Sequence, residues 1–161
     1  PLQISWPGKF EGGQRVGEAV SNVDAVATIL DLAGIDLTKW DLDGQSLVSA
    51  LNGDTSELND VAISEHFAHG TDRAMGMVRL GNWKLCYGHG DPVELELYDL
   101  ENDPGEFTNL AGVSEHSIVQ ERLLKILLDQ WGDPDALTAK IVRDQEDRKI
   151  VRDVTGVGTI F

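Results

Sequence analysis

The sequence predicts a mixed α/β fold built around a four-stranded antiparallel sheet that a long helix covers on one face. Two observations carry this prediction. Four short stretches between residues 61 and 100 have the composition of strands, and glycine-, asparagine- or proline-containing turns separate them. Strands joined by such short turns pair antiparallel. The stretch 114–131 then carries leucines at helical spacing, which predicts a helix with one side buried against the sheet.

Before the sheet, the sequence predicts one strand and one helix. Residues 2–6 alternate apolar and polar side chains like a strand already under way, so we expect the chain to be cut from a longer one. Residues 21–34 have helical periodicity and end at a glycine. Residues 35–60 are predicted to form a loop with a short helix at 46–51. The expected apolar face of the first helix consists of Val23, Val26, Ala27, Leu30 and Ala33.

The sheet and its helix follow, and a charged tail ends the chain. The four predicted strands are residues 61–67, 75–80, 83–87 and 94–100. The helix at 114–131 stacks apolar side chains four residues apart, namely Val119, Leu123, Leu127 and Trp131. Residues 135–153 are charged and predicted to be helical, with too few apolar side chains to form a core. We therefore expect the tail to pack against another subunit or another part of a parent protein.

Composition excludes some partners. The 161 residues carry 13 basic and 28 acidic side chains, a net charge of −15, and this makes nucleic acid or an anionic membrane an unsuitable partner. No apolar run is long enough for a transmembrane helix. The single cysteine, Cys86, cannot form an internal disulfide, so we expect a cytoplasmic protein, although an N-terminal targeting segment is not observable.

No complete catalytic set is present in the sequence. His66 and His69 follow Glu65 where a strand runs into a glycine loop, but this spacing suits a helix better than a strand end, and further metal ligands are missing. A loop that lines a pocket and a solvated polar loop both remain open for this segment. Cys86 is expected to be a small buried apolar residue. No serine nucleophile motif and no phosphate-binding glycine loop occurs.

The segment 96–112, ELYDLENDPGEFTNLAG, predicts a turn out of the fourth strand. Asn102 and Asp103 are residues that bond to backbone amides in turns. Three apolar side chains are expected to hold this loop to the core, namely Leu100, Phe107 and Leu110. On this interpretation the segment is structural and routes the sheet into the long helix.

The same segment resembles the C-terminal signature of the sulfatase family in the alkaline-phosphatase-like superfamily. The resemblance extends, in family order, over PLQISWPGKF, RVGEAVSNVDAVATILDLAGI, DGQSLVSALNG and MVRLGNWKLCY, and so covers residues 1 to about 131. It implies the final strand and helix of an alkaline-phosphatase-like domain at 1–60, a C-terminal subdomain of antiparallel sheet and helix at 61–132, and a tail at 133–161.

The tail resembles the C-terminal extension of choline-sulfatases. Its stretch WGDPDALTAKIVRDQEDRKIVRDVTGVG contains a Gln-x-x-Arg pattern at Gln145 to Arg148. SEHFAHG also resembles a loop of that subgroup, but His66 stands where an aromatic residue is expected and His69 where a second carboxylate is expected. These two departures weaken choline sulfate as the substrate more than they weaken the family resemblance.

The resemblance implies hydrolysis of small-molecule sulfate esters by the full-length protein, with a formylglycine nucleophile and a calcium ion. None of the family's nucleophile or metal-ligand motifs lies in this chain, so we carry over no catalytic residue, no metal ligand and no cofactor of the chain itself. Candidates for a substrate-pocket rim are Glu65, His66, His69 and Arg79. The tail is the candidate contact of a homo-oligomer.

Two other functions remain open. Phosphonate or phosphate monoester hydrolases of the same superfamily share this architecture, and only the upstream half of such a protein separates them from sulfatases. The chain is also compatible with a non-catalytic oligomerisation module.

Overall fold

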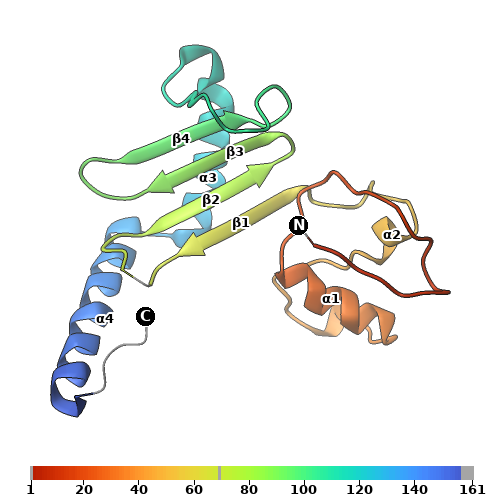
Figure 1. Cartoon of the computed structure of the whole chain (residues 1–161), viewed down its shortest axis with the longest axis horizontal. Helices are drawn as coiled ribbons and strands as arrows, with labels where there is room; N and C mark the ends of the chain where they lie inside the picture. The colour runs from red at the N-terminus through yellow and green to blue at the C-terminus, as the bar shows by residue number, and fades with distance from the viewer. Residues whose placement is uncertain (1, 69, 157–161) are drawn as a thin grey trace. The chain divides into compact units, whose positions relative to one another are not determined.

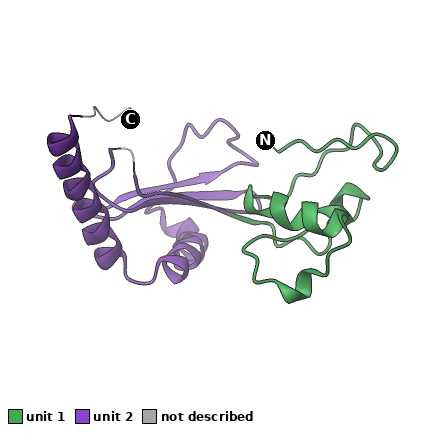
Figure 2. Cartoon of the chain, turned by 90° about the horizontal axis from the view of Figure 1, so that it is seen from below, with its two compact units in different colours: residues 1–62 green, residues 63–161 purple. Residues whose placement is uncertain are grey.

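The computed structural model of the chain describes residues 2–68 and 70–156. It contains two compact units, residues 1–62 and residues 63–161 (Figure 2). No helix among these described residues is long and apolar enough to cross a membrane. The division of residues 63–161 into a sheet subdomain and a separate tail at 133 stays a prediction.

The first unit contains short helices and loops. Its elements are α1 (Val23–Leu32), a 3-10 turn η1 (Leu37–Lys39) and α2 (Val48–Leu51). The helix and the short helix predicted here are confirmed. The strand predicted at residues 2–6 is wrong, because this segment has no strand conformation among the described residues. Alternation alone does not make a strand, since a strand also needs a partner for its backbone hydrogen bonds.

Polar side chains of α1 bind the loop that precedes α2. The Asp24 carboxylate accepts hydrogen bonds from the backbone amides of Ser21 and Gln45, at 2.7 and 2.9 Å. The Thr28 hydroxyl accepts one from the amide of Leu47 at 3.0 Å. Asp24 and Thr28 are both buried. Two of the segments that resemble sulfatases are therefore held together by buried polar contacts.

The apolar side of α1 faces outward within this unit. Val23, Val26 and Ile29 are 46%, 55% and 65% exposed, whereas Ala27 is buried. Of the expected apolar face of this helix, Ala27 is buried and Leu30 half-buried, whereas Val23 and Val26 are exposed, because Asp24 and Thr28 occupy much of the packed side. The helix binds its own unit through polar contacts and leaves apolar side chains on its surface.

The second unit is built on the four-stranded sheet (Figure 1). The strands are β1 (Val61–His66), β2 (Met75–Leu80), β3 (Trp83–Gly88) and β4 (Glu94–Asp99), in the order β1-β2-β3-β4. β2 and β3 pair antiparallel from Met75↔Gly88 to Leu80↔Trp83, and β4 continues the antiparallel pairing on β3. The predicted antiparallel sheet is confirmed, including the two-residue turn Gly81-Asn82.

The helix α3 (Ser117–Trp131), preceded by the 3-10 turn η2 (Ser114–His116), packs across one face of the sheet, which we call the covered face (Figure 1). The largest fully buried side chains form the core there: Val78, Leu85, Leu97, Leu123 and Leu127. Gly76 permits the close approach of the helix, since a Cβ atom at this position would lie 2.7 Å from the Trp131 ring and 2.9 Å from Leu127. The predicted sheet-on-helix core is confirmed.

The segment after β4 borders the sheet edge. The Asn109 side chain accepts hydrogen bonds from the amides of Leu97 and Ala111, at 3.0 and 2.8 Å, and donates one to the Leu95 carbonyl at 3.1 Å. The Leu110 amide donates to the Leu97 carbonyl at 2.8 Å. This segment therefore satisfies the outer backbone groups of β4, which protects an otherwise open edge.

One apolar contact expected in this segment is absent. Phe107 is 91% exposed and does not hold the loop to the core. Its neighbour Glu106 adopts a left-handed backbone, with φ of 57°, and forms an ion pair with Lys84. The loop is fixed by polar contacts instead, including the Asp103 carboxylate, which accepts from the Thr108 amide at 2.8 Å.

The tail forms α4 (Pro134–Thr155), which confirms the predicted helix; residues 157–161 lie outside the described part of the chain. Asp133 caps it by accepting from the amides of Asp135 and Ala136. Near its start, Ile141 is buried and the Thr138 hydroxyl accepts from the Ala74 amide at 3.2 Å. Its last turns project from the sheet (Figure 1) with exposed apolar side chains, namely Ile150, Val151 and Val154.

Candidate functional site

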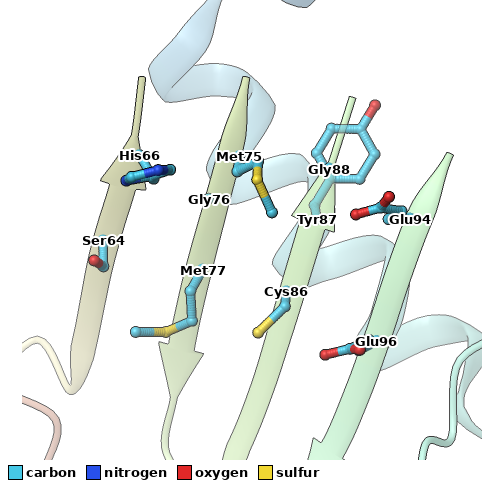
Figure 3. Close-up of a pocket in the computed structure, with 10 residues that line it drawn as sticks. All are labelled: Ser64, His66, Met75, Gly76, Met77, Cys86, Tyr87, Gly88, Glu94 and Glu96. Atoms are coloured by element: carbon cyan, nitrogen blue, oxygen red, sulfur yellow. The ribbon is translucent and has the colours of Figure 1, made fainter. Parts of the chain in front are cut away.

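The four candidate rim residues do not form one cluster. Glu65 and His66 are consecutive in β1 and lie on opposite faces of the sheet. The Glu65 carboxylate accepts a hydrogen bond from the Trp131 indole at 2.7 Å on the covered face, whereas His66 lies on the opposite, open face (Figure 3). Arg79 lies near the far end of β2, where its side chain donates to the Gly81 carbonyl at 3.1 Å. His69 lies outside the described residues.

The open face contains a hollow of about 270 Å³ (Figure 3). Its lining comes from all four strands: Ser64, His66, Met75, Gly76, Met77, Cys86, Tyr87, Gly88, Glu94 and Glu96. Met77 and Cys86 are opposite each other in the β2–β3 register. Both methionines and the single cysteine of the chain thus line one depression, which gives it an apolar floor between polar sides.

The thiol in this hollow is not an activated nucleophile. Burial raises the pKa of Cys86; the nearby Lys84 ammonium acts against this, and the Glu96 and Glu106 carboxylates add to the rise. A raised pKa keeps the sulfur protonated near neutral pH, and a reactive cysteine needs the thiolate. Cys86 is partly buried, which agrees with the small apolar residue that the sequence predicts.

One side of the hollow is acidic. Glu94 forms an ion pair with the Arg73 guanidinium at 3.2 Å. Glu96 is exposed and bonds to the Tyr98 hydroxyl; burial, then the charge of Glu96 and this bond, raise the pKa of Tyr98. Within residues 2–68 and 70–156, Glu96 takes part in no ion pair. The hollow therefore combines an apolar floor with an unpaired negative charge.

A second polar cluster joins β3 to α4. The Tyr87 hydroxyl lies 2.8 Å from His89 Nδ1, and His89 Nε2 lies 2.8 Å from the Asp135 carboxylate. Burial, followed by the charge of Asp135, raises the pKa of Tyr87, so its phenol stays protonated and is not a ready base or nucleophile. The arrangement suits a structural link that holds the first turn of α4.

Metal ligands are not grouped in the described part of the chain. No three His, Cys, Asp or Glu side chains there are placed to hold one ion. The residues present therefore do not fit the calcium site that the family resemblance implies for a full-length protein, and we assign no catalytic step to this chain.

The hollow was missed by the sequence interpretation, although part of it was visible. Alternation places Met75 and Met77 on one face of β2, and the Gly81-Asn82 turn fixes their register against Cys86. The link from Tyr87 and His89 to Asp135 had no sequence pattern, because it joins residues 46 or more positions apart whose proximity depends on where α4 packs.

A family model described as N-sulphoglucosamine sulphohydrolase, C-terminal, matches residues 1–133. The chain belongs to this sulfatase family. A choline-sulfatase of Rhizobium meliloti is 33% identical over 168 aligned residues, which cover 100% of this chain and 31% of that protein. An N-acetylglucosamine-6-O-sulfatase of Bacteroides thetaiotaomicron is 28% identical over 94% of this chain and 28% of that protein. The chain thus spans about a third of the length of these curated relatives.

Solved sulfatase structures agree. A protein solved in complex with its substrate D-glucosamine-2-N,6-O-disulfate superposes with a TM-score of 0.60 and 27% identity, over 74% of this chain and 27% of that one. A putative sulfatase from Bacteroides thetaiotaomicron gives a TM-score of 0.56 and 30% identity, over 67% of this chain and 23% of that one. The family resemblance and the fold class predicted from the sequence are confirmed.

Proposed function

We propose that this chain is the C-terminal part of a sulfatase that hydrolyses small-molecule sulfate esters when it is joined to an upstream catalytic part. The observation that carries the proposal is the match of a sulfatase C-terminal family model to residues 1–133. The curated relatives are about three times as long as the aligned chain, and their printed names are those of sulfatases.

On this proposal, the upstream part supplies the formylglycine nucleophile and the calcium ion, and the isolated chain is inactive. Two observations support this division. The thiol of Cys86 has a raised pKa, and the described residues hold no group of three metal ligands. The outward apolar side of α1, with Val23, Val26 and Ile29 exposed, also suits a helix that packs on further protein.

The contribution of this chain to the substrate pocket is proposed at the end of β1. Glu65 and His66 are exposed there, and the next residues lead into a glycine loop. We retain His69 and Arg79 as further rim candidates. Since Arg79 lies at the opposite end of β2 from Met75 and His66, one small substrate would not contact all four side chains.

Activity of the full-length protein tests this function. We expect turnover of 4-nitrophenyl sulfate that greatly exceeds turnover of 4-nitrophenyl phosphate and of a phenylphosphonate monoester, with choline sulfate and glucosamine 6-sulfate compared as natural ester types. The 161-residue chain is the matched control and should not exceed a buffer blank. A preference for the phosphorus esters would contradict the proposal, as would sulfatase activity in the isolated chain.

We also propose that α4 contributes to a homo-oligomer. Ile150, Val151 and Val154 are 62%, 61% and 82% exposed on its projecting turns, with charged residues around them. Removing residues 135–161 from the full-length protein should lower the number of subunits, which light scattering gives from the mass of the particle. An unchanged number of subunits and unchanged activity would mean that the tail has no role in assembly. A cytoplasmic location belongs to the same proposal, and cell fractionation tests it.

A further inference from the structure

The hollow on the open face exposes apolar side chains near the centre of the sheet. Met75, Met77 and Cys86 are each partly exposed at its floor, although Val78, Leu85 and Leu97 on the covered face are fully buried. Among the described residues of the second unit, no helix lies over this face (Figure 1). Apolar side chains at the centre of a sheet face, with charged side chains at its margin, are typical of a surface that another chain segment covers.

The charged side chains at the margin of the hollow indicate the charge of the group that would bind there. Lys84 on this face is already paired with Glu106, and Glu94 is paired with Arg73. Glu96 has no ion-pair partner among the described residues, although it stands beside the apolar floor. A carboxylate that becomes covered needs a positive partner, because burying an unpaired charge costs free energy.

We propose that a lysine or arginine side chain from the upstream part of the full-length protein docks in this hollow. Its aliphatic stem would lie on Met75, Met77 and Cys86, and its cationic head would reach Glu96. Long basic side chains bury their stems along apolar surface in this way while the charged head keeps polar partners. The inference rests on the proposed function, since it requires the chain to be one part of a longer protein.

Size and charge favour this occupant over two others. The volume of about 270 Å³ lies below the range of roughly 300–1,000 Å³ that is usual for small-molecule pockets, and it suits one long side chain. A second copy of this chain, docked through the same face about a two-fold axis, would bring the two acidic margins together. In the curated relatives, the part outside the aligned region makes up about two thirds of the length, and on the proposed function such a part belongs to every molecule.

Alkylation of Cys86 in the full-length protein tests the docking. The rate is followed on the peptide that contains Cys86 by mass spectrometry, and is compared with the rate for the same peptide in urea. In the native wild type we expect labelling slower by about a hundredfold, because a docked side chain covers the thiol. The neutral Glu96→Gln and charge-reversing Glu96→Lys variants should each speed native labelling, the second by about tenfold or more beyond the increase that the same substitution causes in the isolated 161-residue chain, where loss of the Glu96 charge alone lowers the pKa of the thiol.

Controls keep the result interpretable. Glu121→Lys makes the same charge change at an exposed position of α3 and should leave the rate unchanged. Thermal melting shows whether Glu96→Lys unfolds the protein. If it does, the labelling rate of Glu96→Gln alone tests the docking. Rapid labelling of native wild type overturns the inference, and so does equal protection in both Glu96 variants. Carbodiimide cross-links from Glu96 to a second, isotope-labelled copy would overturn it in favour of a homodimer.

Sulfate-ester turnover, measured on the same samples, separates this inference from the proposed function. Turnover together with freely reactive Cys86 would contradict the docking and support the proposed function. Absence of turnover, with Cys86 protected in a Glu96-dependent way, would support the docking and contradict the proposed function.

Discussion

The two faces of the sheet differ in how far their apolar side chains are buried. On the covered face Val78, Leu85 and Leu97 are fully buried by α3, a helix of the same unit. On the open face Met75, Met77 and Cys86 lie partly exposed. In β2, apolar residues occupy both faces, with Met75 and Met77 on the open face and Val78 on the covered one, so alternation alone does not decide burial there. The difference teaches that the described chain supplies the cover for one face and leaves the other partly exposed.

The largest expected effect contrasts a leucine on the covered side with a methionine on the open face. Leu127→Ala removes a fully buried side chain and should lower the free energy of unfolding of the 161-residue chain by about 2–5 kcal/mol. Met77→Ala removes a partly exposed one and should cost less than about 1 kcal/mol. Urea unfolding measures both. Equal losses would mean that the two faces are equally buried.

A smaller effect is expected at the sheet edge. Asn109→Ala removes the side chain that bonds to the amides of Leu97 and Ala111 and the carbonyl of Leu95. Water can replace part of these exposed contacts, so we expect a loss of about 1–2 kcal/mol in the same urea experiment. Thr108→Ala, at an exposed neighbouring position, is the control and should change stability by less than about 0.5 kcal/mol.

The sequence predicts most elements of the second unit because each has a local cause. Strand alternation, the Gly81-Asn82 turn and helical leucine spacing all act over a few residues, and the resulting sheet and α3 are present. The failures have non-local causes. Phe107 is apolar but exposed, because Asn109, Asp103 and Lys84 fix the loop instead.

Grouping of side chains was harder to predict than elements. Glu65 and His66 are neighbours in sequence, yet β geometry sends them to opposite faces. The expected apolar face of α1 is buried only in part, since Asp24 and Thr28 bind a loop about 20 residues away. A rule that places apolar residues inward cannot anticipate a buried polar contact whose partner lies on another segment.

Lowering the pH should reduce the stability of the fold through protonation of Asp99. A hydrogen bond from the Asn102 side chain lowers the pKa of Asp99; burial acts against this, while backbone amides of the loop and His116 add to the lowering. A carboxylate with a lowered folded pKa stabilises the fold above its ordinary pKa of about 3.9, and this contribution is lost as pH falls through the folded value.

Asp99→Asn tests this in the 161-residue chain. The variant should be less stable than wild type at pH 7 by less than about 1 kcal/mol, because the contact between Asp99 and Asn102 is near the surface. The difference should shrink as pH falls below about 4. The exposed Glu121→Gln is the control. A stability difference that stays constant down to pH 2 would mean that the loss comes from packing and not from the charge of Asp99.

The smallest effect concerns the open face. Burial of Cys86 by its own strands raises the pKa of the thiol even without an occupant, and the charge of Glu96 contributes to the rise. Iodoacetamide reacts with the thiolate, so its rate on the 161-residue chain should have a pH midpoint above the ordinary cysteine value of about 8.5. Glu96→Gln removes a negative charge and should move the midpoint down by a fraction of a unit, whereas Glu121→Gln should not. A wild-type midpoint at or below 8.5 would place Cys86 in full contact with water, and the open face would then lack the partly apolar floor that distinguishes it from an ordinary solvated sheet surface.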